Sequence, residues 1–259
     1  MSDLLVSFAA AGGAPPASHE LVRVFRDGSV RALAATAWPG FGPVDEAGVY
    51  RLDLDDHALA DLERLATDPQ PPQVPDASLQ PGSGRFVLRL GDEEPLRWSP
   101  FEAPPEPLAT LAARLETLLR EARAQPVAAV RLGLDATAGE SWELAYTFTA
   151  LGNEPVTLTV PRGSLRVRVV AAPEPPSGPP PLAWAREALP VEADGAGPVE
   201  LAPGEALTLT AAIGAPPVAA RHRVDGFARV ALDLAGSADA AEAHVEATLG
   251  AGPVAVDVR

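Results

Sequence analysis

The residues best suited to chemistry in this chain are its histidines and one short acidic cluster. The histidines are His19, His57, His222 and His244. No two of them have the His-x-x-x-His spacing that places two imidazoles on one helical face. The cluster Asp53–His57 could present carboxylates and an imidazole to a divalent metal. It fails as a calcium loop, because Ala58 and Arg64 stand where glycine and glutamate are needed. An N-cap that compensates a helix dipole, at Asp55 or Asp56, is the simpler interpretation.

Several other catalytic chemistries are excluded by composition. The chain has no cysteine, and all 20 of its basic residues are arginine, so thiolate nucleophiles, zinc–thiolate sites and lysine Schiff bases are impossible. The pair Glu93-Glu94 falls in an expected hairpin turn, where water solvates it, and Gly82-Ser83-Gly84 is typical of a flexible loop. We therefore expect no enzymatic activity, no cofactor and no metal.

Arginines provide the first candidate binding residues. Arg162, Arg166 and Arg168 stand close together, and Arg221-His222-Arg223 forms a second local patch. In a strand over Leu165–Val170, Arg166 and Arg168 point to one face. Such a row could bind carboxylates of a partner bidentately, or it could be a solvent face that discourages edge pairing. The solvent-face interpretation is favoured, because most charged side chains are simply solvated.

The second candidate is Trp184, which lies in a proline-rich stretch at about 173–197. Proline favours an extended path there. Trp184 could anchor a partner protein, since tryptophan is a frequent interface hot spot, or it could fold back over the core of its own domain. The sequence does not distinguish these two interpretations.

Length and charge restrict the possible partners. A chain of 259 residues fits two modest domains. Its formal net charge of −15 disfavours nucleic acid and anionic membranes, because both are recognised through basic groups. A signal peptide begins with positively charged residues, whereas the early charge here is the negative Asp3. We therefore expect Leu4–Phe8 to be a first strand and the protein to be cytoplasmic.

Residues 1–125 predict an α+β domain, an antiparallel sheet with two helices. The expected helices are Asp56–Ala66 and about Glu106–Ala124, each with an apolar stripe at helical spacing. The expected strands are Leu4–Phe8, Leu21–Phe25, Val30–Ala34, Val49–Leu54, Arg85–Leu90 and Leu96–Trp98. Asp27-Gly28 is a strong hairpin-turn signal between the second and third of them. Two helices on one face of the sheet would bury both stripes.

Residues 126–259 predict an all-β sandwich with the proline-rich insertion. Short strands recur between turn residues, and no helix pattern is found. The expected strands are Val127–Leu134, Trp142–Thr149, Val156–Val160, Leu165–Val170, Val199–Leu201, Leu207–Ile213, Phe227–Leu234, Ala243–Leu249 and Val254–Val258. The last two are expected to be separated by a turn at Gly250–Pro253.

Two resemblances suggest a function class. Trp142–Thr149, Gly152–Leu158 and Leu201–Glu205 resemble the immunoglobulin-like domain of the bacterial intracellular proteinase inhibitors (BsuPI-like). The N-terminal half resembles emfourin-like metalloprotease inhibitors in element order, with Gly12-Gly13 in the first loop and without a signature motif. The resemblances imply an immunoglobulin-like sandwich and inhibition of a proteinase.

These observations together predict a non-enzymatic protein that binds another protein, with proteinase inhibition as its expected role. The candidate partner-binding residues are Trp184, Arg166, Arg168, Arg221 and Arg223. Two alternatives stay open: an accessory subunit of a larger bacterial assembly that pairs through a strand edge, and a hydrolase with an unrecognised site.

Overall fold

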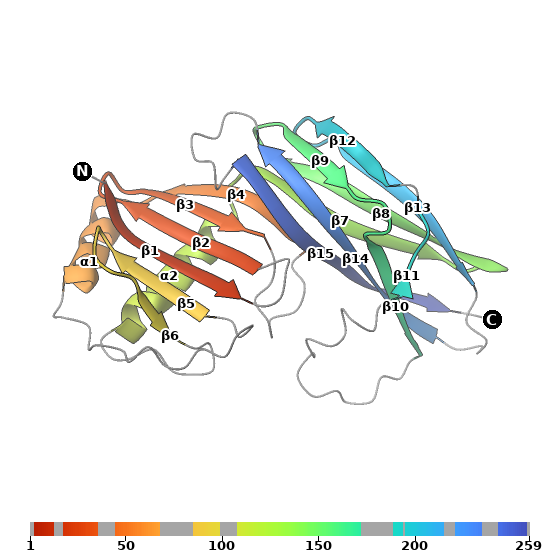
Figure 1. The fold of residues 1–259 in the computed structure, drawn as a ribbon, viewed down its shortest axis with the longest axis horizontal. Helices are drawn as coiled ribbons and strands as arrows, with labels where there is room; N and C mark the ends of the chain where they lie inside the picture. The colour runs from red at the N-terminus through yellow and green to blue at the C-terminus, as the bar shows by residue number, and fades with distance from the viewer. Residues whose placement is uncertain are drawn as a thin grey trace. The chain divides into compact units, whose positions relative to one another are not determined.

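The structure is a computed structural model, and it describes residues 3–12, 18–35, 45–67, 85–98, 108–171, 189–193, 195–214, 221–234 and 243–257. The chain forms two compact units. Unit 1 comprises residues 1–34 and 49–127, and unit 2 comprises residues 35–48 and 128–259. The prediction of a β-rich fold with two helices in its N-terminal half is confirmed (Figure 1). The division at residue 125 stays a prediction, as does the immunoglobulin-like class.

Unit 1 is built on an antiparallel sheet with the strand order β3-β2-β1-β5-β6. Its elements are β1 (Leu4–Gly12), β2 (Ser18–Phe25), β3 (Ser29–Ala34), α1 (Asp56–Thr67), β5 (Arg85–Leu90), β6 (Leu96–Trp98) and α2 (Leu108–Ala122). Strand β4 (Glu46–Asp53) is divided between the two units: its residues up to Gly48 belong to unit 2, and those from Val49 onward belong to unit 1. The helices contact each other and lie on one face of the sheet (Figure 1).

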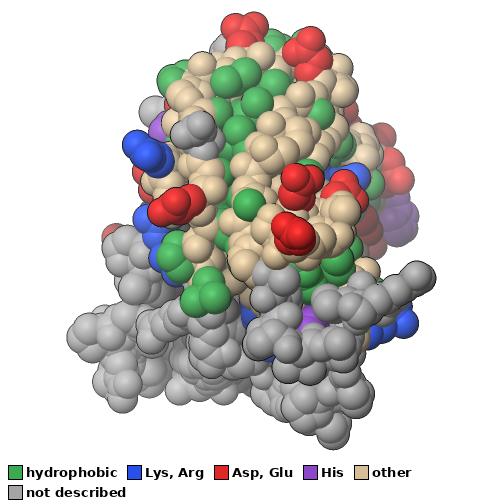
Figure 2. All heavy atoms as spheres, turned by 90° about the vertical axis from the view of Figure 1, so that its right-hand side faces the viewer, with side chains coloured by type: hydrophobic (Ala, Val, Ile, Leu, Met, Phe, Trp, Pro, Cys, Tyr) green, Lys and Arg blue, Asp and Glu red, His purple; other side chains and the backbone are tan. Residues whose placement is uncertain are grey.

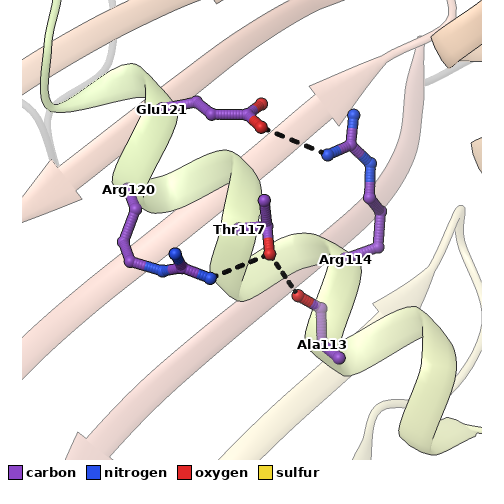
Figure 3. Close-up of polar contacts among 5 residues, drawn as sticks. All are labelled: Ala113, Arg114, Thr117, Arg120 and Glu121. Carbon is purple, nitrogen blue, oxygen red and sulfur yellow. Dashed lines mark hydrogen bonds and ion pairs between the residues drawn. The ribbon is translucent and has the colours of Figure 1, made fainter.

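The apolar stripe of α2 is the centre of this core. Leu111, Leu115 and Leu118 are at most 1 % exposed and pack with Val22 and Val24 of β2. The opposite face of α2 is polar: the Thr117 hydroxyl donates to the Ala113 carbonyl, and Arg114 pairs with Glu121 at 3.4 Å (Figure 3). The helix therefore follows the amphipathic pattern of its sequence.

Two local signals in unit 1 have the predicted geometry. Gly28 has φ +85°, a conformation that glycine adopts easily, in the turn between β2 and β3. The Asp27 carboxylate accepts hydrogen bonds from the Ser29 hydroxyl and amide, which lower the pKa of Asp27. At α1, the Asp55 carboxylate accepts the amide hydrogen of Ala58 at 2.7 Å, so Asp55 is the N-cap.

In the first sheet of unit 2 the strand order is β13-β8-β7, and β7 is followed by β4. Its strands are β7 (Pro126–Thr137), β8 (Ser141–Gly152) and β13 (Ala206–Gly214). The register between β8 and β13 runs without interruption from Ala206 opposite Thr149 to Gly214 opposite Ser141. The segment before Gly48 is tied to β7 by an ion pair of 2.7 Å between Arg131 and Glu46.

The second sheet of unit 2 has the order β11-β10-β14-β9-β12, and β15 pairs with β14. Its strands are β9 (Val156–Val160), β10 (Leu165–Ala171), β11 (Leu189–Pro190), β12 (Ala196–Leu201), β14 (Arg221–Leu234) and β15 (His244–Asp257). The turn predicted at Gly250–Pro253 is wrong. There β15 continues past a cis Gly252-Pro253 bond and a register shift against β14, so the extra residues are absorbed as a bulge.

The inner faces of these two sheets form the core of unit 2 (Figure 1). Trp142, Leu144, Tyr146 and Phe148 alternate along β8 and are fully buried. A Cβ atom on Gly226 of β14 would lie 2.9 Å from the Tyr146 ring, which shows how closely the sheets approach. The two layers agree with the predicted sandwich architecture.

Candidate functional site

Four of the predicted binding residues lie on the outer face of two neighbouring strands. Strands β10 and β14 pair antiparallel, with Arg168 opposite Asp225 and Val170 opposite Arg223. Residues at odd positions of β14 and even positions of β10 therefore share this face, away from the core. We call the four residues Arg166, Arg168, Arg221 and Arg223 the arginine face. The sequence presented them as two separate patches, and strand pairing brings them together.

The residues of the arginine face differ in exposure. Arg166 and Arg221 are exposed, whereas Arg168 and Arg223 are half-buried. Arg168 and Arg223 are diagonal neighbours across the strand pair, a relation in which residues lie about 7–8 Å apart. The spacing suits side chains that reach toward the same small group of carboxylates.

A buried acid lies among these arginines. Asp225 is 2 % exposed, and its Oδ1 atom lies 3.3 Å from Nε of Arg223. Phe227, which faces Arg166 across the strand pair, is 3 % exposed on the same face. Sequence reasoning missed both residues. The alternation Arg221-x-Arg223-x-Asp225-x-Phe227 is a period-two signal that would have placed them with the arginines.

The backbone under the arginine face is fixed from the opposite sheet. The Tyr146 hydroxyl of β8 donates to the Arg166 carbonyl oxygen at 2.9 Å. Burial raises the pKa of Tyr146, so this phenol stays protonated and remains a donor. The bond couples the backbone of β10 to the opposite sheet.

His222 does not belong to the arginine face, although it stands between two of its residues. It points inward, is 2 % exposed, and its ring centroid lies 5.4 Å from that of Trp142. Neither ring nitrogen has a hydrogen-bond partner within the described residues. Because an imidazole at the end of the core is closed to solvent, His222 packs as an aromatic side chain.

The remaining sequence candidates lie apart from this face or outside the described residues. Asp55 is occupied as a helix cap, while His57 is exposed and 3.7 Å from Asp61. Glu93 and Glu94 are exposed in the turn between β5 and β6. Trp184 and Gly82–Gly84 lie outside the described residues, and so does the side chain of His19. Among the residues that the structure describes, no three His, Asp or Glu side chains gather in a way that could hold a metal ion.

The arginine face contrasts with the charge of the whole chain. With 35 acidic against 20 basic residues, most surfaces are expected to be negative. Figure 2 shows acidic side chains scattered over one such surface, with basic ones at its margins. A local row of guanidinium groups in this setting can take carboxylates by paired hydrogen bonds.

Comparison with protein-family models, with curated proteins and with solved structures finds no match to this chain. In the described part of the chain, neither helix has the length and apolar character needed to cross a membrane.

Proposed function

We propose that this protein acts by binding another protein, and that the arginine face receives carboxylates of that partner. The single observation that carries the proposal is the placement of Arg166, Arg168, Arg221 and Arg223 on one face of β10 and β14. Arginine suits this role because its planar guanidinium group matches a carboxylate bidentately, and because it is less strongly hydrated than an ammonium group.

The chemistry of the chain supports binding over catalysis. Cysteine and lysine are absent, which removes two classes of nucleophile. The buried Asp225 beside Arg223 can orient that guanidinium group before a partner arrives, and pre-organisation lowers the cost of binding.

The finer proposal is that unit 2 is an immunoglobulin-like sandwich and that the partner is a proteinase. Two facing antiparallel sheets support the sandwich class, and the resemblance of Trp142–Thr149 to intracellular proteinase inhibitors supports the partner class. The protein is expected to act in the cytoplasm, as its sequence predicts.

The test is affinity capture with matched charge variants, quantified by mass spectrometry. The double variant Arg166→Glu/Arg168→Glu is expected to lower capture of the partner at least about ten-fold, because repulsion replaces charge-assisted bonds. The control is Arg114→Glu/Arg120→Glu on the polar face of α2 (Figure 3), which makes the same change of charge in unit 1. This control should capture as the wild type does.

Equal capture by the two double variants would remove the arginine face from the proposal. A captured proteinase should lose its activity as the protein is added, with the loss complete at one equivalent. Several co-captured subunits without inhibition would favour an assembly protein instead, and turnover of a substrate by the purified chain would favour a hydrolase.

A further inference from the structure

Strand β13 is an edge strand without any of the usual protection. It stands at the end of the first sheet of unit 2 and, within the described residues, pairs only with β8. Its nine residues Ala206–Gly214 contain no charge and no proline, and its register with β8 shows no bulge. Exposed strand edges of this kind readily pair with another strand.

Strands β3 and β7 each have β4 as a further neighbour, and the remaining terminal strands of the described sheets are all protected. Strand β6 has three residues, and β11 has two and ends in Pro190. Strand β12 carries Pro198 with a register shift, and β15 carries Pro253 with another. Short length, proline and bulges each prevent edge pairing. The lack of such a device in β13 alone is therefore a feature to be explained.

The inward side chains of β13 are incompletely covered. Leu207, Leu209 and Ile213 face the core side of the sheet but remain half-buried. Their neighbours on β8, Phe148, Tyr146 and Trp142, are fully buried in the same layer. One additional strand beside β13 would remove these three apolar side chains from water.

We infer that β13 pairs antiparallel with β13 of a second copy of this chain, about a two-fold axis at Thr210. An axis there pairs the whole strand, whereas an axis at Thr208 would pair only Ala206–Thr210. Thr210 then faces its own copy, Leu207 faces Ile213, and Leu209 faces Ala211. A threonine pair is favourable across strands, Leu207 and Ile213 form an apolar pair, and no like charges meet.

The symmetry also limits the assembly. Among its described strands each chain has one unprotected edge, so one pairing uses both edges and the assembly closes at two copies. Pairing with a strand of another protein would depend on the side chains of that strand. In the register given above, β13 already complements itself. The inference is independent of the proposed function, which concerns the other sheet of unit 2.

The test uses the absence of cysteine from the chain. In a Thr210→Cys variant, the two Cα atoms at the axis should lie about 4.5–5.5 Å apart, within the roughly 4.4–6.8 Å that a disulfide bridges. Diamide, which accepts the two thiol hydrogens, should convert this variant to a covalent dimer. In the control Ala206→Cys the two cysteines should lie roughly 26 Å apart, so cross-linking should be at least about ten-fold slower.

A second measurement follows the mass in solution by light scattering. The wild type should approach twice the 26.8 kDa of one chain as its concentration rises. Thr210→Asp places two carboxylates opposite each other and should weaken the dimer at least about ten-fold, while Thr137→Asp, exposed on β7 of the same sheet, should not.

Circular dichroism verifies that both aspartate variants are folded. A monomeric mass for the wild type at every concentration and salt would overturn the inference, even if another protein occupied the edge. An unchanged dimer in Thr210→Asp would overturn it as well, and so would equal cross-linking of the two cysteine variants.

Discussion

The arginine face and the edge strand β13 belong to the same unit but present opposite chemistry. On β10 and β14, Arg223 lies 3.3 Å from the buried Asp225 and Arg168 stands opposite it, whereas β13 carries no charge in nine residues. On the inner side both regions follow one rule, in which mostly apolar side chains alternate toward the core. The chemical difference between them lies in the residues of the outer face.

This difference separates two ways of recognising a partner. Guanidinium groups attract carboxylates over a distance that is set by the screening of the salt, and they select them by the geometry of paired hydrogen bonds. An uncharged edge acts through backbone hydrogen bonds and selects by register and side-chain size. The two proposals, carboxylate binding at the arginine face and edge pairing at β13, therefore predict two different partners for one unit.

The largest effect on stability is expected from Asp225→Ala. The carboxylate is buried beside Arg223, and its removal leaves a guanidinium group without this acceptor, so we expect a loss of about 2–4 kcal/mol in the free energy of unfolding. The control Asp233→Ala removes an exposed carboxylate from the same face of β14, 2.6 Å from His244, and should cost less than about 1 kcal/mol. Urea unfolding of the two variants compares their losses in the free energy of unfolding. Similar losses would mean that the ion pair between Arg223 and Asp225 does not stabilise the fold.

Glycine substitutions separate the packed interior from the open edge. In Gly226→Ala the new Cβ meets Tyr146 at 2.9 Å and Leu134 at 3.1 Å, so we expect a loss of about 1–3 kcal/mol. Gly214 of β13 has nothing within 4 Å of the corresponding position, and Gly214→Ala should change stability by less than about 0.5 kcal/mol or raise it slightly. Thermal unfolding measures both, and similar costs at the two positions would show that Gly226 is not the more closely packed of the two.

Most elements of the fold were predictable from local patterns. The apolar stripe of α2 and the turn at Asp27-Gly28 depend on residues close in sequence. Such local patterns do not depend on which strands pair in the folded protein. The continuation of β15 through Gly252-Pro253 was not predictable, because glycine and proline together are typical of a turn and only the pairing with β14 shows a bulge.

The candidate site was predictable in its residues but not in its assembly. Arg166 and Arg168 share a face by period two, and so do Arg221 and Arg223. Their union depends on the antiparallel register of β10 with β14, across more than fifty residues of chain, and no local pattern encodes that register. Likewise, β13 was expected as a strand, but its place at the edge follows only from the strand order.

A smaller effect is expected at the bond that joins the two sheets beneath the arginine face. Tyr146→Phe removes the hydrogen bond to the Arg166 carbonyl and should cost about 1 kcal/mol at neutral pH. Burial raises the pKa of Tyr146 above its ordinary value of 10.0, so the unfolded state loses the phenolic proton first. The contribution of this group is therefore complete below about pH 10 and declines as pH rises toward the folded-state pKa.

The measurement is urea unfolding of the wild type and Tyr146→Phe at pH 9 and pH 11. Wild-type stability should fall by about 1 kcal/mol more than that of the variant over this interval. Equal losses in the two proteins would show that the phenol of Tyr146 titrates normally, and the inner side of the arginine face would then be open to solvent.

The smallest expected effect, and the most direct test of the contrast, is the response to salt. Screening weakens attraction between guanidinium groups and carboxylates, so capture of the partner should fall a few-fold between about 0.1 M and 0.5 M sodium chloride. Dimerisation through β13 brings together two chains of net charge −15 whose contact is uncharged, so the same salt should strengthen it a few-fold. Binding isotherms and light scattering on one preparation give both slopes. Slopes of the same sign would mean that one kind of force governs both surfaces, and the separation between charge recognition and edge recognition would then fail.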